Sequence, residues 1–270
     1  MYTKSVSKSE SLVRRIDIVL PVYNEEDILA ASVKTLKQFL KQNCHHTWQI
    51  VIADNASTDS TARVAKLLVA QFPEVGYLYI PLKGRGRALR HVWLRSDADI
   101  VSYMDIDLST DLSCFMPMID EIVSGRADIV SGSRYKKGAK VKRGLKREVL
   151  SRGYIGIMKA MFQCHFSDAQ CGFKAVSRRA VQALVPLIEN QGWFFDAELL
   201  LLAEHFGFTV AEVPVTWTDD LDSRVKIAQT VSEHFMGLLR MRLAFTTGLT
   251  PEPAKLTSAS AVRQLVLNFQ

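Results

Sequence analysis

The sequence has no long, uninterrupted apolar run. Although 48% of its 270 residues are hydrophobic, no uncharged apolar stretch approaches the roughly 20 residues that a helix needs to span a bilayer. The N-terminal segment MYTKSVSKSESLVRR lacks the apolar core of a secretory signal, and we expect a loose leader over residues 1–14. These absences predict a chain without a transmembrane helix, so that any contact with a membrane must be peripheral.

Cysteine is scarce, and its spacing excludes two kinds of cross-link. The chain has four cysteines: Cys44, Cys114, Cys164 and Cys171. They form no CxxC pair and no compact zinc knuckle, so we interpret them as reduced thiols of a cytoplasmic protein. A chain of this length can bury one large core without disulfides. We expect one main domain over residues 15–245 and a Pro-, Ser- and Thr-rich tail over 246–270.

Acidic residues are absent from residues 134–147, RYKKGAKVKRGLKR, which carry eight Lys or Arg residues. The positive charge of this segment alone exceeds the formal net charge of the whole chain, which is +6. Such a basic segment suits an anionic partner: a phospholipid surface, a phosphorylated substrate or nucleic acid. A solvated loop without a partner is the alternative that the charge pattern leaves open.

Short apolar runs alternate with helix-period segments in the first half of the chain. We expect buried parallel strands at residues 16–22, 48–53, 75–80, 98–104 and 127–132. The segments between them repeat apolar residues every three or four positions, as helices packed on a sheet do. Repeated βα units predict an open α/β sheet, whose ligands bind beyond the carboxyl ends of its strands.

After residue 133 the pattern becomes less regular. The expected elements are a helix at 146–165, a turn-rich stretch at 167–177, a helix at 177–185, a helix at 194–208 capped by Gly207, a strand at 209–217 and an amphipathic helix at 223–245. We interpret this part as a second layer on the α/β core.

The first two predicted strands end in polar motifs. Pro21, Tyr23 and Glu25 follow the first strand, where they can line a nucleobase or simply cap the next helix. Asp54 ends the second strand, a position from which an acidic residue accepts a hydrogen bond from a ribose hydroxyl in other nucleotide-binding α/β folds. Together the two motifs indicate a nucleotide site.

The loop from Lys83 to Arg87, KGRGR, opens the third predicted helix. Its glycines permit close backbone approach, and a helix N-terminus attracts phosphate. The loop is not a Walker motif, because GxxxxGK[ST] is absent. Lys83 and Arg87 are therefore candidates for binding a nucleotide diphosphate.

Two carboxylates, Asp105 and Asp107, follow the fourth predicted strand. Hard divalent cations prefer carboxylate oxygens, and Mg²⁺ or Mn²⁺ bound in this way can neutralise a departing nucleotide diphosphate. The spacing and position of this pair predict a site for one of these metals. Turn and cap residues are the alternative.

These motifs, taken in order, resemble glycosyltransferase family 2, which has the GT-A nucleotide-sugar-binding fold. The resemblance runs from Ile16 to Ala244 through LPVYNEE, DNASTDST, KGRGRALR, MDIDLST, SGSRY, SDAQCGFKAV, FFDAELLLLAEHFGF and EVPVTW. SDAQCGFKAV and WFFDAELL resemble the branch of dolichyl-phosphate glucose synthases and polyprenyl-phosphate mannose synthases. The resemblance implies a mostly parallel central sheet flanked by helices, with amphipathic helices near the C-terminus, and a catalytic domain over residues 15–245.

The resemblance also implies roles for individual residues. Arg134 matches a position that engages the phosphate of a lipid acceptor, and Arg224 resembles a second phosphate-binding position. Asp168 lies on the acceptor side of the site, and Asp107 takes part in catalysis through the metal. Whether Asp168 or Asp196 acts as a base, or whether both are structural, stays open.

The expected function is inverting, metal-dependent transfer of a hexose from UDP-glucose or GDP-mannose to a polyprenyl or dolichyl phosphate, at the cytoplasmic face of a membrane. Transfer to a hydroxyl of a saccharide or small molecule is the alternative within the class. A non-catalytic nucleotide-sugar-binding or nucleic-acid-binding protein is the alternative outside it. Because nucleic-acid binding would leave the acidic strand ends unexplained, we expect no nucleic-acid partner.

Overall fold

The computed structural model describes residues 13–218 and 227–253. Most of the predicted leader (1–14), much of the predicted tail (246–270) and Arg224 therefore lie outside the described residues.

The centre of the structure is a seven-stranded sheet in the order β3-β2-β1-β4-β7-β5-β8. The strands are β1 (Arg15–Val22), β2 (Thr47–Asn55), β3 (Val75–Ile80), β4 (Ile100–Met104), β5 (Ile129–Ser133), β7 (Phe173–Ser177) and β8 (Val210–Pro214). The five strands predicted in the first half are confirmed.

Strand β7 is the exception to the parallel pattern. It lies between β4 and β5 and runs antiparallel to both, whereas the other neighbouring strands of this sheet are parallel. The prediction of a turn-rich stretch at 167–177 is wrong for residues 173–177, which form β7. The run FKAVS is short and carries Lys174 at its second position, so it lacks the apolar pattern of a buried strand.

The basic segment contains a short strand. β6 (Lys140–Lys142) pairs in parallel with β9 (Thr216–Thr218) in a separate two-stranded sheet. The strand predicted at 209–217 is therefore two strands, β8 and β9, separated by the buried Val215. The paired β6 fixes the middle of the basic segment against the rest of the molecule.

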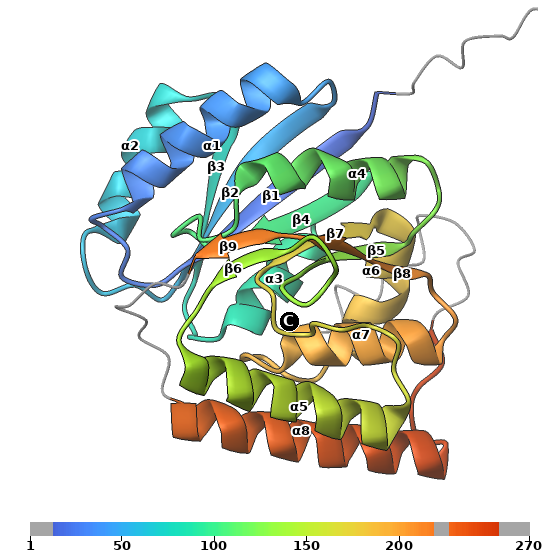
Figure 1. The fold of residues 1–270 in the computed structure, drawn as a ribbon. Coiled ribbons are helices and arrows are strands. Elements are labelled where there is room, and N and C mark those ends of the chain that lie inside the picture. Colours follow the sequence, from blue (N-terminus) through green and yellow to red (C-terminus); the bar gives the residue numbers. More distant parts are fainter. Residues whose placement is uncertain (1–12, 219–226, 254–270) are drawn as a thin grey trace, which may run out of the picture.

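Helices cover both faces of the main sheet (Figure 1). They are α1 (Leu29–Asn43), α2 (Thr61–Gln71), α3 (Arg85–Trp93), α4 (Phe115–Val123), α5 (Leu145–Phe162), α6 (Arg178–Leu184), α7 (Phe195–His205) and α8 (Ile227–Thr247), with 3-10 turns η1 (Leu112–Cys114) and η2 (Val185–Leu187). Helices α1, α2 and α4 pack on one face, and α3, α6 and α7 on the other. Their apolar residues recur at the helical period, which is why one side of each helix faces the sheet.

Helices α5 and α8 form an outer layer over α7 (Figure 1). Consequently the residues of α7 from Phe195 to Ala203 are all buried, since the helix lies between the sheet and this layer. None of the helices in the described parts of the chain is long and apolar enough to cross a membrane.

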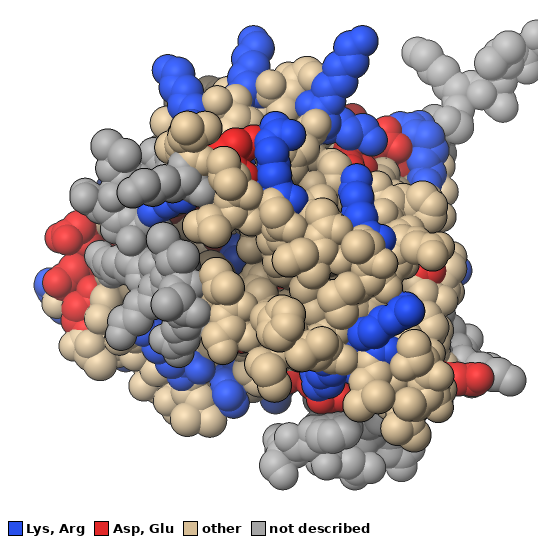
Figure 2. Space-filling view, turned by 60° about the horizontal axis from the view of Figure 1, so that its bottom comes forward, with Lys and Arg blue, Asp and Glu red and all other residues tan. Residues whose placement is uncertain are grey.

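The outer side of this layer is apolar. The exposed large hydrophobic residues are Leu145, Val149, Leu150 and Ile157 on α5, and Val231, Phe235, Met236, Leu239 and Leu243 on α8. Figure 2 brings this side of the molecule forward and shows a broad area of uncharged side chains with Lys and Arg around and within it. We call this surface the α5–α8 face.

Candidate active site

The predicted nucleotide and metal motifs meet at one edge of the sheet. The end of β1 pairs with the end of β2, so Pro21 lies opposite Ala53, and Val22 opposite Asp54. Strand β4 pairs with the other side of β1 and leads directly into Asp105. The carboxyl ends of parallel strands thus bring together motifs that are far apart in the sequence.

Hydrogen bonds join the loops after β1 and β2 into one wall. The backbone N–H of Asn24 donates to Ser57 Oγ at 3.0 Å, and that of Glu25 donates to Thr61 Oγ1 at 2.8 Å. Beside this wall, Lys83 Nζ lies 3.5 Å from the centroid of the Tyr23 ring. The loops predicted to bind the base and the diphosphate are therefore in contact.

Asp54 is fully buried at the base of this wall. Its Oδ1 accepts from the backbone N–H of Ser57 at 2.9 Å, and its Oδ2 accepts from the Tyr77 hydroxyl at 2.8 Å. Burial, followed by the hydrogen bond and charge of Asp54, raises the pKa of Tyr77, so this hydroxyl stays a donor. Asp54 thus stabilises its own loop, in addition to its predicted role as acceptor of a hydrogen bond from a ribose hydroxyl.

The glycines of the KGRGR loop make room for protein rather than for an empty anion site. A Cβ at Gly84, whose φ is +155°, would lie 2.4 Å from the carbonyl oxygen of Gln191, and one at Gly86 would lie 2.6 Å from Phe195 Cβ. The backbone N–H of Gly86 donates to Gly192 O at 3.2 Å, and that of Arg87 to Gln191 O at 3.0 Å. These amides, expected to attract phosphate, are already bonded.

Asp105 and Asp107 differ in their surroundings. Asp105 Oδ1 lies 2.9 Å from Arg85 Nη2, whereas Asp107 is exposed and accepts from the backbone N–H of Ser109 at 3.0 Å. Burial raises the pKa of Asp105, because attraction by Arg85 offsets only part of this effect and repulsion by the charge of Asp107 adds to it. A positive charge at this pair is therefore favourable.

A buried charged cluster lies behind this pair. Asp196 accepts a short hydrogen bond from the Tyr103 hydroxyl and pairs with Arg85 Nη1 at 3.2 Å and with Lys174 Nζ at 3.4 Å. The guanidinium of Arg85 lies over the Tyr103 ring at 5.0 Å and over the Trp193 ring at 4.8 Å. Sequence reasoning missed Arg85 and Lys174 as residues of the site. Two features could have indicated them: Arg85 is a cation between two glycines, and Lys174 is a cation within a buried strand.

Arg134 and Asp168 form a bidentate ion pair. Arg134 Nε lies 2.7 Å from Asp168 Oδ2, and Arg134 Nη2 lies 2.9 Å from Asp168 Oδ1. Their side chains are only 8% and 1% exposed. Burial alone would raise the pKa of Asp168, but the charge and hydrogen bonds of Arg134 bring it below its ordinary value. The guanidinium also lies 5.3 Å from the centroid of the Trp217 ring.

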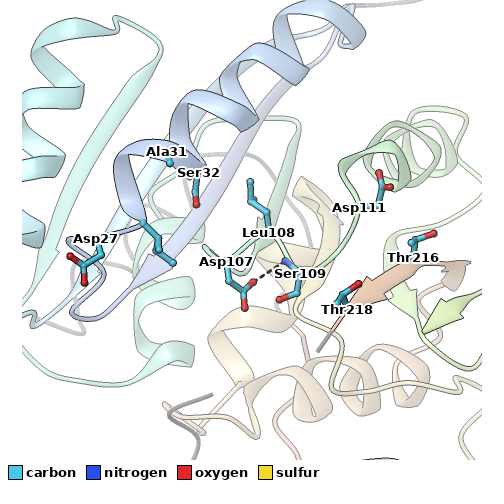
Figure 3. A pocket seen from close by; sticks show the side chains of 10 residues that line it. Asp27, Ala31, Ser32, Asp107, Leu108, Ser109, Asp111, Thr216 and Thr218 are labelled. Carbon is cyan, nitrogen blue, oxygen red and sulfur yellow. Dashed lines mark hydrogen bonds between the residues drawn. The ribbon is translucent and has the colours of Figure 1, made fainter. Parts of the chain in front are cut away.

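A cavity of about 710 Å³ opens beside Asp107 (Figure 3). Its lining comes from the start of α1, the loop after β4 and strand β9: Asp27, Ile28, Ala31, Ser32, Asp107, Leu108, Ser109, Asp111, Thr216 and Thr218. The carboxylates and hydroxyls around it are hydrogen-bonding partners for polar ligands. Of the predicted site residues, Asp107 borders this cavity, while Arg134 and Asp168 do not line it.

The residues at the strand end fit a divalent cation. Among the described residues, no group of three or more His, Cys, Asp or Glu side chains lies close enough to hold a metal alone. Mg²⁺ is commonly held by one or two carboxylates, with substrate phosphates and water as its other ligands. A Cβ at Gly172 would lie 1.9 Å from Asp105 Oδ2 and 2.7 Å from Arg85 Nη2, so glycine at this position makes room for this ion pair.

Two curated proteins are similar to this chain over most of its length. Glycosyltransferase AglD of Haloferax volcanii is 33% identical over 221 residues, which cover 80% of this chain and 35% of that protein. Dolichyl-phosphate beta-glucosyltransferase ALG5C of Trichomonas vaginalis is 31% identical over 242 residues, which cover 86% of this chain and 72% of that protein. The chain thus spans about a third of the length of AglD.

The fold also matches a solved structure. Glucosyl-3-phosphoglycerate synthase of Mycobacterium tuberculosis, crystallised with Mn²⁺, UDP and glucosyl-3-phosphoglycerate, superposes with a TM-score of 0.63. The match covers 85% of this chain and 80% of that chain at 19% sequence identity. At this identity the likeness establishes the fold, and it confirms the predicted GT-A architecture.

The sequence profile described as Glycosyl transferase family 2 matches residues 17–185. This range runs from β1 to the start of η2 and includes Asp105, Asp107, Arg134 and Asp168. It confirms the resemblance carried by the ordered motifs. The chain belongs to glycosyl transferase family 2.

Proposed function

We propose that this protein transfers glucose from UDP-glucose to a polyprenyl phosphate of the dolichyl type. The observation that carries the proposal is the meeting of Asp105 and Asp107 with Pro21, Tyr23 and Asp54 at one sheet edge. The name of the relative that is 31% identical over 86% of this chain, a dolichyl-phosphate beta-glucosyltransferase, supports glucose and a lipid phosphate as the reactants.

Asp105 and Asp107 would hold a divalent cation, Mg²⁺ or Mn²⁺. When bound, such an ion neutralises negative charge that develops on a leaving nucleotide diphosphate. The Mn²⁺ and UDP in the structural neighbour support this choice. Lys83 and Arg87 remain predicted contacts of the diphosphate, and Pro21, Tyr23, Glu25 and Asp54 remain predicted contacts of the nucleoside.

The acceptor side needs no strong base if the acceptor is a phosphate. A phosphate monoester has a second pKa of about 6, so its attacking oxygen is already ionised near neutral pH. The low pKa of Asp168 and its pairing with Arg134 make this carboxylate a poor base. Asp196 is buried and bonded to Arg85, Lys174 and Tyr103, which also disfavours proton abstraction. This chemistry favours a phosphate over a hydroxyl acceptor.

The acceptor phosphate would be bound by the two predicted cations, Arg134 and Arg224. Arg134 offers a planar fork of donors, although Asp168 holds part of that fork in this structure. Arg224 is the second predicted contact and lies outside the described residues. Asp168 then orients Arg134, so the two predicted catalytic residues would act as one unit.

The α5–α8 face supports peripheral binding to lipid. An exposed apolar surface bordered by cations suits a membrane that contains anionic phospholipids. Exposed cations on and next to these helices include Lys142, Arg152, Lys159 and Arg242. The free thiols of all four cysteines support a reducing compartment, hence the cytoplasmic face of the membrane.

The test is transfer of radiolabelled sugar from UDP-glucose, and separately from GDP-mannose, to polyprenyl phosphate with Mg²⁺ or Mn²⁺. We expect a lipid-soluble product from UDP-glucose that disappears with EDTA. Asp107→Asn should lower its formation by about 10²- to 10³-fold, because the carboxylate contributes several kcal/mol of charge stabilisation through the metal.

Asp97→Asn is the matched control, because Asp97 is an exposed carboxylate that precedes β4, at the opposite end of that strand. It should keep wild-type activity. Donor hydrolysis or transfer to a soluble hydroxyl acceptor, without any lipid product, would refute the polyprenyl-phosphate acceptor.

A further inference from the structure

The segment of residues 189–194 is bonded on one side to α8. Glu233, on α8, accepts with its Oε1 from the backbone N–H of Trp193 at 2.9 Å and from that of Phe194 at 3.3 Å. Hydrogen bonds to a charged acceptor are stronger than those between neutral groups, so this carboxylate is an effective anchor. A single side chain of α8 thus fixes the end of the segment that precedes α7.

The other side of the segment is bonded to the start of α3. The carbonyls of Gln191 and Gly192 accept the backbone N–H groups of Arg87 and Gly86, at 3.0 and 3.2 Å. The ring of Trp193 lies 4.8 Å from the guanidinium of Arg85. The segment therefore connects α8 to the start of α3, where Arg85 pairs with the proposed metal ligand Asp105.

An ion pair and two hydrogen bonds hold the beginning of the segment. Arg240 of α8 lies 2.7 Å from Glu198, whose side chain is 1% exposed. The carboxylate of Glu198 accepts the backbone N–H groups of Glu189 and Asn190, both at 3.0 Å. Because both ends of the segment depend on α8, the helix and the segment form one connected unit.

The contacts leave no space for a side chain at two glycines. A Cβ at Gly192 would lie 2.3 Å from Glu233 Oε1, and a Cβ at Gly84 would lie 2.4 Å from Gln191 O. Both distances are far below van der Waals contact, so a side chain at Gly192 would displace Glu233, and a side chain at Gly84 would displace segment 189–194. Glycine at these two positions permits the close approach.

We propose that Glu233 is a positioning residue for the nucleotide-sugar donor site. It holds segment 189–194, which in turn holds the start of α3 and keeps Arg85 beside Asp105. This inference rests on the proposed function, because that function identifies this edge of the sheet as the donor site. Since α8 also contributes to the α5–α8 face, the helix that contacts lipid is the helix that positions the donor loop.

Binding of UDP in the presence of Mn²⁺, measured by isothermal titration calorimetry on the full chain, tests the proposal. Glu233→Ala removes the acceptor, and Gly192→Ala displaces it sterically. Both should weaken UDP binding by about 10- to 100-fold, the effect typical of losing a group that orients a site residue. Glu233→Gln should lie closer to wild type, because its amide oxygen can still accept from the same N–H groups.

Ser232→Ala is the matched control, because Ser232 is an exposed polar residue at the neighbouring position of α8 and loses its side-chain oxygen in the same way. It should bind UDP as wild type does. Circular dichroism and thermal melting identify any variant that fails to fold. A second measurement uses wild type alone: UDP and Mn²⁺ should slow amide hydrogen exchange in residues 189–194.

The outcomes separate the two proposals. If wild type binds neither UDP nor GDP with Mn²⁺, the proposed function and this inference both fail. If wild type binds UDP and a folded Glu233→Ala variant binds it equally well, the positioning role alone is refuted. Unchanged amide exchange of segment 189–194 on UDP binding would refute it as well.

Discussion

At the scale of single residues, the site is governed by charges that neutralise one another, all of them buried except the partly exposed Asp105. Asp105, Asp168 and Asp196 lie with Arg85, Lys174 and Arg134 in contacts of 2.7 to 3.4 Å. An unpaired buried charge is costly, and removing one partner of a buried pair typically costs about 3–5 kcal/mol. Each of these cations therefore stabilises the fold, in addition to any contact that it makes with substrate.

The Arg134 and Asp168 pair yields a prediction about pH. With Arg134 present, the pKa of Asp168 lies below its ordinary value of 3.8, so the pair stabilises the fold at pH 7 and loses this effect only as pH falls below 3.8. In Arg134→Met the buried carboxylate lacks its cation, and its pKa should rise above 3.8. The variant should lose about 3–5 kcal/mol at pH 7 and recover part of it at pH 5.

Urea denaturation at pH 7 and pH 5 measures this difference. Arg126→Met is the control, because it removes an exposed ion pair with Glu121 and should differ from wild type by the same amount at both pH values. An equal destabilisation of Arg134→Met at the two pH values would mean that Asp168 does not take up a proton in this range.

At the scale of elements, the packing of α3 on α7 explains why the first turn of α3 needs glycine. Gly86 lies against Phe195 at the start of α7, and an added Cβ would meet the Phe195 Cβ at 2.6 Å and its ring at 2.9 Å. Close-packed cores tolerate extra atoms poorly. Glycine at this position sets the distance between the two helices and thereby places Arg85 and Asp196 within contact.

Two glycine substitutions should have opposite effects on stability. Gly86→Ala should destabilise the protein by about 1–3 kcal/mol, the usual cost of overpacking. Gly153→Ala is the matched comparison, because Gly153 lies in α5 and an added Cβ there would meet nothing within 4 Å. It should stabilise by about 0.5–1 kcal/mol, since alanine is the better helix former. Thermal melting compares the two, and a stable Gly86→Ala variant would contradict the proposed close contact.

At the scale of the whole molecule, two surfaces lie on different sides of the same layer. The inner side of α5 and α8 covers α7 (Figure 1), whereas the outer side exposes apolar residues (Figure 2). A soluble monomer rarely exposes a contiguous apolar surface of this kind without a partner. We propose an anionic membrane as this partner, because it also explains the cations around the surface.

The membrane proposal predicts vesicle binding that depends on α8. Phe235 and Leu239 are 51% and 44% exposed, and each should contribute roughly 1–2 kcal/mol when lipid covers it. The double variant Phe235→Glu, Leu239→Glu should therefore lose co-sedimentation with vesicles of phosphatidylglycerol and phosphatidylcholine. Added salt should weaken binding by wild type, because screening reduces attraction by the cations.

Leu67→Glu is the control, because Leu67 is an even more exposed apolar residue, at 62%, and lies on α2, across the sheet. It should bind vesicles as wild type does. Unchanged binding of the double variant would refute the proposal. A wild-type dimer in solution that the double variant abolishes would instead identify this surface as an interface between two copies.

Much of the fold followed from the sequence. The five strands at 16–22, 48–53, 75–80, 98–104 and 127–132 were predicted within a few residues, because buried parallel strands are continuous apolar runs bounded by turns. Strand β7 was missed, because its pattern is broken by Lys174. That residue is tolerated in the core only because Asp196 and two carbonyls, those of Ala169 and Cys171, surround its ammonium.

The sequence by itself determined the α/β class, the family and the position of the polar motifs at strand ends, because periodicity and order along the chain are local properties. Only the tertiary structure decided which charges meet. Arg134 and Asp168 are 34 residues apart, and Arg85 and Asp196 are 111 apart. Such pairs form because the sheet order and helix packing bring distant segments within a few ångströms, and burial then requires each charge to have a partner.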